Sequence, residues 1–347
     1  GGESMSFMTT WEGNSYWLSP TGRSAVAYRV LNGIALTCTG PFGDPAEWMD
    51  DLNGFAQHCA ERLLSPVFYS VHREQRDALL EAGWNSIEVG SEMVVDPRGW
   101  KTTGKKWQDV RTAINKAKRD GVTDVQSTFL EASLDVREQI EDISEEWARL
   151  KALPEMKFTL GGVEELRDPR VRLLYAIDAD GRVLGVTSWL PTWRDGRIVG
   201  WTLDFMRHRT DSPNGIMEFL IARMAERLRD EGLADSDHAV EFMSLSAAPL
   251  AGMNPERDNA QEGGVPAGEG TQVLQHALQI VADWMEPAYG FHSLFNFKHK
   301  FQPTEAPVYV CYPDPAALPQ IGLAVVRAYV PSVTPAEVAG MLSTLRS

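Results

Sequence analysis

The stretch from residue 200 to residue 220 constrains the fold most, because it joins a strand to a helix through a short basic segment. Trp201, Leu203 and Phe205 alternate along the chain at the period of a strand. Ile216 begins a run of apolar residues at helical spacing. The sequence therefore predicts a strand that leads, after one basic turn, into the N-terminus of a helix.

The turn between this strand and this helix has the composition of an anion-binding site. Ser212 is expected as the N-cap and Pro213 as the first helical residue, and Gly215 leaves the first helical turn without a bulky side chain. The free backbone N–H groups of such a terminus attract phosphate or carboxylate groups. The pattern also fits an ordinary capped junction, but Arg207 and Arg209 in the same turn favour an anion.

Length and composition limit the class of protein. A chain of 347 residues with 43% hydrophobic residues is long enough for about two globular domains with full cores. It has no run of about eighteen apolar residues and no signal-peptide pattern, so nothing in this sequence is expected to span a membrane. The three cysteines lack CxxC spacing and the histidines lack metal-ligand spacing. We therefore expect no disulfide framework, no metal and a reducing compartment.

The charge is unevenly distributed. A net charge of -15 disfavours nucleic acid or anionic lipid as a partner, but residues 98–119 form a basic segment on this acidic chain. Trp107, Val110 and Ile114 recur there at helical spacing, which predicts an amphipathic helix from Lys105 onward. The cations of interest on its outer face are Lys105, Lys106, Arg111, Lys116, Lys118 and Arg119. Such a face is commonly only solvated, but here it also fits tRNA or an anionic bilayer.

The predicted elements repeat in order along the chain. The second unit is expected to contain three antiparallel strands, a helix, a strand, a helix and a closing strand, at residues 172–177, 183–192, 198–206, 213–229, 241–246, 271–285 and 308–312. The first unit shows a weaker version between residues 16 and 95. This is the order of an N-acetyltransferase-like (GNAT) fold. We therefore predict an α+β protein with two GNAT-like units, residues 1–123 and 124–347, each a mixed, mostly antiparallel sheet flanked by helices, with the chemistry in the second.

Several blocks of the sequence resemble the catalytic domain of the aminoacyl-phosphatidylglycerol synthases, the multiple peptide resistance factor family. The blocks follow one another in the family's order at residues 6–8, 16–17, 40–45, 104–121, 155–161, 200–220, 245–252 and 289–303. The resemblance implies two fused GNAT-like folds that move an amino acid, lysyl or alanyl, from aminoacyl-tRNA to the hydroxyl of a lipid such as phosphatidylglycerol. It also implies a soluble domain at the cytoplasmic face of the membrane, joined in many relatives to an N-terminal transmembrane domain. Lys157 departs from the family, which usually has a small residue there, and this concerns amino-acid or acceptor specificity.

Transfer of an activated ester to an alcohol depends mainly on positioning, which can lower a barrier by roughly 7–11 kcal/mol. It requires no covalent nucleophile and no cofactor. A general base adds a factor on the order of 10²–10⁴, and Asp211, beside Arg209 at the expected helix start, is the candidate. The alternative is a carboxylate that only caps the helix. Glu218, one turn further, is expected to bind the amino group of the substrate, unless it is an ordinary surface residue.

Residues 295–303 alternate at strand period and are expected to form a strand with Lys298 and Lys300 on one face. An edge strand protected by lysines has the same pattern, but the resemblance places a lysine pair here and favours phosphate binding. The other residues expected to bind substrate are Arg207, Ser212, Asn214, Gly215, Glu155 and Phe158.

Two other classes of function stay open from the sequence. One is transfer to a non-lipid small-molecule acceptor, from aminoacyl-tRNA or from acyl-CoA. Residues 211–215 lack the glycine pattern of an acyl-CoA loop, so we expect that acetyl-CoA is not the donor. The other is a non-catalytic module that binds tRNA or a membrane surface, which a transfer assay distinguishes from an enzyme.

Overall fold

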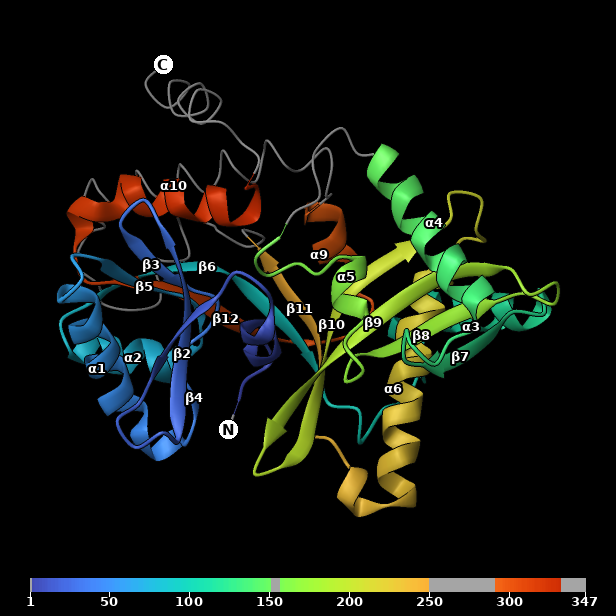
Figure 1. Ribbon diagram of the computed structural model, residues 1–347. Helices are drawn as coiled ribbons and strands as arrows, with labels where there is room; N and C mark the ends of the chain where they lie inside the picture. The colour runs from blue at the N-terminus through green and yellow to red at the C-terminus, as the bar shows by residue number, and fades with distance from the viewer. Residues whose placement is uncertain (1, 151–156, 250–290, 332–347) are drawn as a thin grey trace.

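The computed structural model describes residues 2–150, 157–249 and 291–331. Figure 1 shows two groups of strands and helices that are joined through the middle of one sheet. The helix predicted from the sequence at residues 271–285 lies outside the described residues, as does Glu155. No helix in the described part of the chain is long and apolar enough to cross a membrane.

The N-terminal half has the predicted order of strands and helices. It contains β1 (Ser15–Leu18), β2 (Ser24–Leu31), β3 (Ile34–Thr37), β4 (Phe42–Gly43), α1 (Trp48–Ala60), β5 (Ser65–Val71), α2 (Arg73–Glu81) and β6 (Asn85–Val95). Asn32 and Gly33 have φ values of 52° and 79°, as a two-residue hairpin turn between β2 and β3 requires. Helices α1 and α2 cover one face of these strands, around the buried Phe55 and Leu79.

The remaining elements begin with the basic helix α3, whose apolar face is buried as predicted. They are α3 (Gln108–Arg119), β7 (Thr123–Ser127), α4 (Leu134–Leu150), α5 (Val163–Leu166), β8 (Arg172–Ile177), β9 (Val183–Arg194), β10 (Arg197–His208), α6 (Ile216–Ala234), β11 (Phe242–Pro249), α9 (Phe291–His299), β12 (Thr304–Tyr312) and α10 (Leu318–Tyr329). Short 3-10 helices add Ser6–Thr10, Pro45–Glu47, Lys105–Trp107, Ser236–His238 and Pro315–Ala317. The three antiparallel strands β8, β9 and β10 and the helix α6 confirm the predicted core of the second unit.

The two expected sheets are joined into one path of neighbouring strands, β1-β2-β3-β5-β12-β6-β11-β10-β9-β8-β7, with β4 beside β2. The pairs β3–β5 and β10–β11 are parallel, and the other pairs are antiparallel. β12, late in the chain, lies between β5 and β6 of the N-terminal half, where Thr304 pairs with Val94 and Tyr312 with Asn85. The α+β fold with two GNAT-like halves is therefore confirmed, with the halves sharing one hydrogen-bonded sheet.

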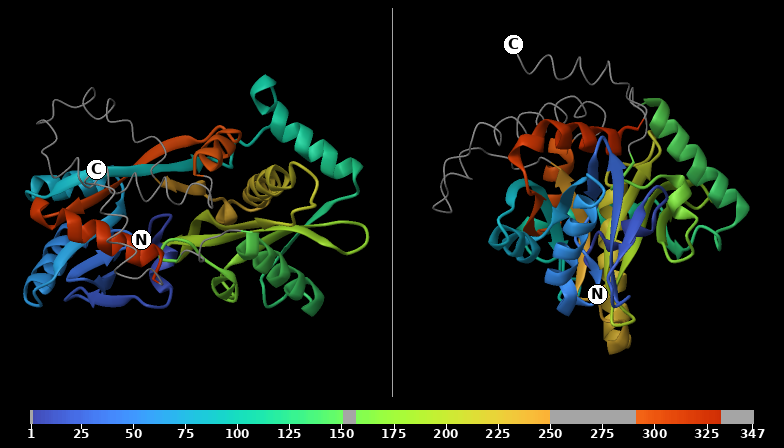
Figure 2. Two further views of the ribbon diagram at one scale, coloured as in Figure 1. Left: turned by 90° about the horizontal axis from the view of Figure 1, so that it is seen from above. Right: turned by 60° about the vertical axis from the view of Figure 1, so that its left-hand side comes forward.

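Helices lie on both faces of this sheet, so two large cores form. Figure 2 shows α6 and α4 on opposite faces of β8–β10, and α10 across the N-terminal strands. The core on the α6 side also contains the buried face of α3, including Val110 and Ile114. The core on the other side contains residues of α4 and α10, among them Ile140 and Ile321. This second core joins the two halves of the protein.

The strand predicted at residues 295–303 is wrong, because α9 is a helix. Its aromatic residues recur at both i, i+2 and i, i+4, and a short run of this kind does not distinguish a strand from a helix. The helix uses the second spacing. The Phe295 and His299 rings are 4.5 Å apart, and the Phe297 and Phe301 rings are 5.6 Å apart. Neighbouring side chains in this segment therefore do not alternate between two faces of a sheet.

Candidate functional site

The candidate site forms where β10 and β11 separate. They are parallel neighbours over only three residues on each strand, 200–202 and 242–244, although both strands continue further. Near the end of this ladder Ser246 has a φ of 66°, and its hydroxyl donates to the carbonyl of Leu203. This irregular backbone ends the regular pairing of the two strands.

Helix α6 begins at Ile216, later than the sequence predicted, and its N-terminus differs from the expected one. Ser212 is not the N-cap: its hydroxyl donates to the carbonyl of Leu184 at 2.5 Å. Gly215 occupies the N-cap position with a φ of 92°, a left-handed conformation that favours glycine. A Cβ at this position would lie 2.9 Å from the Cβ of Ala113 in α3. The first turn of α6 therefore has no side-chain cap.

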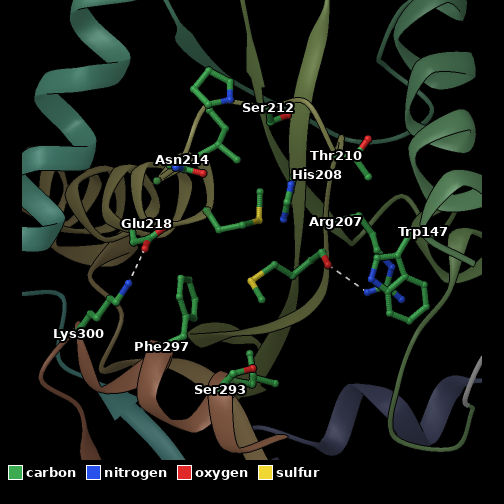
Figure 3. Close-up of a pocket in the computed structure, with 16 residues that line it drawn as sticks. Trp147, Arg207, His208, Thr210, Ser212, Asn214, Glu218, Ser293, Phe297 and Lys300 are labelled. Carbon is green, nitrogen blue, oxygen red and sulfur yellow. Dashed lines mark hydrogen bonds and ion pairs between the residues drawn. The ribbon is translucent and has the colours of Figure 1, made fainter. Parts of the chain in front are cut away.

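A cavity of about 530 Å³ lies at this helix terminus (Figure 3). It is bounded by the end of β10, the start of α6, α9 and one side chain of α4, Trp147. The residues predicted from sequence that line it are Arg207, Ser212, Asn214, Gly215, Glu218 and Lys300. The predicted basic turn and the late lysine segment therefore meet in one cavity.

Glu218 and Lys300 form the polar wall of this cavity on its α6 and α9 side. Lys300 Nζ donates to Glu218 Oε1 at 2.7 Å, and the glutamate side chain is only 15% exposed (Figure 3). Lys300 also lies over the Phe297 ring, 5.5 Å from its centroid. The pair presents one anionic and one cationic group to a ligand.

Arg207 forms the opposite wall. Its guanidinium carbon lies 3.6 Å from the centroid of the Trp147 ring and 4.8 Å from that of Phe205. Its Nη1 donates to the carbonyl of Met206 at 3.0 Å. Stacking on two aromatic rings holds this cation in place beside the cavity.

Asp211 and Arg209 do not line the cavity. Asp211 accepts from Arg182 Nη2 at 2.7 and 2.9 Å, and its side chain is 61% exposed. The hydrogen bond from Arg182 holds the pKa of Asp211 below its usual range. Arg209 Nε donates to the carbonyl of Val183 at 2.8 Å. These two side chains therefore fasten the turn to β9, and the geometry gives no support to Asp211 as a base.

Lys298 is separated from Lys300 by the helical geometry. Its side chain is buried, and Nζ donates to the carbonyls of Ser246 and Ala247 at 3.2 and 3.3 Å. Burial lowers the pKa of Lys298 to about 7, although Glu92 acts in the opposite direction. The two lysines therefore do not form one phosphate clamp: Lys300 faces the cavity, and Lys298 supports the irregular part of β11.

Asp204 is a candidate residue that the sequence analysis missed. Its Oδ1 accepts from the backbone N–H of Gly161 at 2.9 Å, and its buried Oδ2 has no hydrogen-bond partner among the described residues. Burial raises the pKa of Asp204 to about 7; Glu165 also raises it and Arg207 lowers it. A carboxylate in the middle of a strand with apolar neighbours was the available signal.

Two further side chains of the cavity were also missed. His208 donates through Nδ1 to the carbonyl of Arg209, 2.8 Å away, which leaves Nε2 of the neutral ring as the acceptor. Trp147 comes from α4, sixty residues before Arg207, so only the tertiary structure brings it to the site. In contrast, Phe158 does not line the cavity and is buried between Tyr69 and Tyr329.

The basic helix is partly used within the protein. Arg111 Nη1 donates to the carbonyls of Thr102 and Gly104, both at 2.6 Å. Lys116 pairs with Asp120 at 2.5 Å. The predicted cations that are classed as exposed on and before this helix are Lys105, Lys106, Lys118 and Arg119. No group of three or more His, Cys, Asp or Glu side chains in the described part of the chain could hold a metal ion.

A GNAT-like sheet that separates beside the N-terminus of a helix, with a polar cavity at that point, defines the class of acyltransferase-like proteins. Within this class, the chain belongs to the family described as phosphatidylglycerol lysyltransferase, C-terminal, whose model matches residues 1–312. This membership confirms the resemblance drawn from the sequence blocks.

Curated relatives match nearly the whole chain. An uncharacterised protein of Corynebacterium glutamicum is 38% identical over 332 residues, which are 95% of this chain and 39% of that protein. The lysylphosphatidylglycerol biosynthesis bifunctional protein LysX of Mycobacterium ulcerans is 28% identical over 326 residues, 94% of this chain and 28% of that protein. The chain therefore spans less than two fifths of the length of these relatives.

Two solved structures share the fold. The C-terminal domain of a putative lysylphosphatidylglycerol synthetase from Agrobacterium fabrum has a TM-score of 0.76 at 19% identity, over 96% of this chain and 94% of that one. L-PGS from Bacillus licheniformis has a TM-score of 0.75 at 20% identity, over 94% and 92%.

Proposed function

We propose that this chain transfers an aminoacyl group, lysyl or alanyl, from aminoacyl-tRNA to a hydroxyl of phosphatidylglycerol at the cytoplasmic face of the membrane. The observation that carries the proposal is the cavity at the start of α6, lined by Arg207, Glu218 and Lys300, in a member of the phosphatidylglycerol lysyltransferase family. LysX, by its name, acts in lysylphosphatidylglycerol biosynthesis, and the family description names a lysyl transfer.

The reaction exchanges one ester for another. The lipid hydroxyl oxygen bonds to the carbonyl carbon of the aminoacyl ester, and the bond from that carbon to the ribose oxygen of tRNA breaks. The hydroxyl proton passes to a base, and a proton returns to the ribose oxygen. Because the donor is already activated, the protein contributes mainly by holding both substrates, an effect of roughly 7–11 kcal/mol at most.

The charged groups of the cavity suit these substrates. Arg207 and Lys300 are cations on opposite walls, and the start of α6 has backbone N–H groups without a side-chain cap. Such groups bind the phosphate of a lipid headgroup or of the tRNA end. Glu218 pairs with Lys300 in the protein alone and is the anion available for the ammonium group of the amino acid.

We assign the base to Asp204 and not to Asp211. A pKa of about 7 allows a carboxylate both to exist ionised and to accept a proton at neutral pH. Asp204 does not itself line the cavity, but it lies on β10 two residues before Met206 and three before Arg207, which do, and its Oδ2 has no hydrogen-bond partner among the described residues. Asp211 is ion-paired to Arg182 and exposed, and hydrogen bonding lowers its pKa, which makes it a weaker base.

The basic helix supplies a surface for tRNA or for the anionic bilayer. Lys105, Lys106, Lys118 and Arg119 are exposed there, and Arg111 and Lys116 have contacts within the protein. These local cations attract the phosphate groups of such a partner, although the net charge of the whole chain repels them.

The test is incubation of the purified protein with a mixed aminoacyl-tRNA pool and a total lipid extract, followed by mass spectrometry of the lipids. The expected product is a lysyl or alanyl ester of phosphatidylglycerol, absent when the tRNA is deacylated beforehand. If labelled amino acid appears only on a water-soluble acceptor, the lipid assignment is wrong. If no acceptor is labelled by aminoacyl-tRNA or acyl-CoA, the protein is not a transferase under these conditions. That result would favour a non-catalytic module that binds tRNA or a membrane surface.

A further inference from the structure

Residues 157–161, the 157–161 loop, connect the last helix of the described structure to the Asp204 carboxylate. At its start, the backbone N–H of Lys157 donates to the carbonyl of Tyr329, the final residue of α10, at 2.9 Å. Thr159 Oγ1 and the Tyr329 hydroxyl are 2.7 Å apart. At its end, Gly161 donates its N–H to Asp204. The loop is therefore fastened to α10 and to β10.

The backbone of this loop needs such fastening. Phe158 has a φ of 73°, in the left-handed region, which a bulky residue adopts at a cost on the order of 1–3 kcal/mol. Its ring is packed edge-on against Tyr329, with centroids 5.4 Å apart, and lies 5.6 Å from Tyr69. Contacts with residues outside the loop therefore stabilise a conformation that the loop would not favour alone.

The loop also covers Asp204 closely. A Cβ added at Gly161 would lie 2.1 Å from Asp204 Oδ2, so no side chain fits at this position of the loop unless the carboxylate moves. The neighbouring Gly162 donates its N–H to Glu165 at 2.7 Å. Two charged groups near Asp204 affect its pKa: Glu165 of α5 raises it, and Arg207 of β10 lowers it.

We propose that the hydroxyl of Tyr329 is a positioning group for the transfer reaction: by holding the 157–161 loop, it keeps the Asp204 carboxylate oriented and shielded from water. The inference rests on the proposed role of Asp204 as the base. α10 begins after residue 312, where the family model ends, so this contribution comes from an element outside the matched segment.

Four variants test the contact between Tyr329 and Thr159. Tyr329→Phe and Thr159→Val break the same hydrogen bond from its two ends, and Thr159→Ser keeps the hydroxyl. Tyr69→Phe is the matched control, because it removes only the 3.1 Å contact between the Tyr69 and Tyr329 hydroxyls. Near-ultraviolet circular dichroism of each variant confirms that the fold is retained.

The first measurement is the titration of Asp204 followed by the NMR signal of its carboxyl carbon in the full chain. Burial is the largest cause of the raised pKa and the bond from Gly161 a smaller, opposing one, so release of the loop lowers the pKa. We expect this for Tyr329→Phe and for Thr159→Val. A fifth variant that combines these two substitutions should be shifted no further than the larger single one, because both break the same hydrogen bond. Thr159→Ser and Tyr69→Phe should titrate like the unmodified chain. An unchanged titration in Tyr329→Phe overturns the proposal.

The second measurement is the pH dependence of kcat for lipid aminoacylation. Its acidic limb should move to lower pH in Tyr329→Phe and Thr159→Val by the same amount as the carboxyl titration. If the titration moves and the limb does not, Asp204 is not the base and the catalytic role of Tyr329 is excluded with it. Because the NMR titration needs no substrate, it reports on the loop even if the proposed transfer reaction is wrong.

Discussion

Lys300 Nζ and Glu218 Oε1 are 2.7 Å apart on one wall of the cavity, where the residue that follows α9 by one position meets the first turn of α6. The two residues are 82 positions apart in the sequence, so the ion pair exists only because the late helix packs beside the start of α6. The pair places one cation and one anion on this wall of the cavity.

Lys300→Ala should weaken substrate binding before it slows the chemical step. Removal of the ammonium group takes away its attraction for the substrate phosphate and leaves the negative charge of Glu218 without its ion-pair partner. We therefore expect KM for the lipid to rise about tenfold, with a smaller change in kcat. Steady-state kinetics with phosphatidylglycerol vesicles measure both. Arg194→Ala is the control, because Arg194 is paired with Glu241 and does not line the cavity. A lower kcat at unchanged KM would contradict a binding role.

Asp204→Asn and Asp211→Asn separate the two candidate bases. Loss of a general base should reduce kcat of Asp204→Asn by about 10²-fold or more, with little change in lipid binding. Asp211→Asn should keep near-normal turnover, because the carboxylate only pairs with Arg182. Single-turnover transfer from radiolabelled aminoacyl-tRNA provides the measurement. The opposite ranking of the two variants would return the base to Asp211.

The stability of the protein should depend on the ionisation of Asp204. Its pKa is raised to about 7, above roughly 3.9 in the unfolded chain, so between these values the folded state holds the extra proton. Asp204 therefore lowers the free energy of unfolding as pH rises through this window, by at most about 1.4 kcal/mol per pH unit. Above about pH 7 it adds no further pH dependence.

Asp204→Asn removes this dependence, so its stability relative to the unmodified chain should be higher at pH 8 than at pH 5. Urea unfolding at the two pH values measures the difference. Asp211→Asn is the control: its lowered pKa places its contribution below this window, and the same comparison should show no change. If the free energy of unfolding changed with pH in the same way for Asp204→Asn and for the unmodified chain, the pKa of Asp204 would not be raised in the folded protein.

Gly161→Ala should impair the site where an ordinary glycine replacement does not. The new Cβ would lie 2.1 Å from Asp204 Oδ2, so the carboxylate or the loop must shift, and turnover should fall strongly. Gly99→Ala is a matched control, because no atom lies within 4 Å of its added Cβ. Parallel measurements of kcat and melting temperature test the pair. Equal kcat values in the two variants would show that the loop tolerates displacement.

The basic helix should determine the salt dependence of partner binding. Charge reversal of Lys105, Lys106 and Lys118 should weaken binding to tRNA or to anionic vesicles and flatten the salt dependence, by about one unit of slope for each lost phosphate contact. Arg62→Glu, at an exposed residue beyond α1, is the control. Binding curves at several salt concentrations measure the slopes. Unchanged slopes for both partners would exclude this helix as the contact surface.

Local patterns predicted much of this fold and part of the site. Alternation in β10 and helical spacing in α6 and α3 were read correctly, because one face of each is buried. The strand predicted around Phe297 was wrong, since its aromatic spacing suits two structures and packing decided between them. Trp147, Asp204 and Tyr329 were missed because their surroundings come from distant segments. The expectation that acetyl-CoA is not the donor stays a prediction.

The position of β12 between β5 and β6 also sets the order in which the protein can be completed. Residues 304–312 pair with residues 85–94, more than two hundred positions earlier. Contacts of such sequence separation are slow to form because a long loop must close first. During synthesis, the sheet of the N-terminal half therefore stays open at its middle until β12 has left the ribosome. A nascent chain that stops before residue 304 carries two unpaired strand edges, and it is there that chaperones should bind.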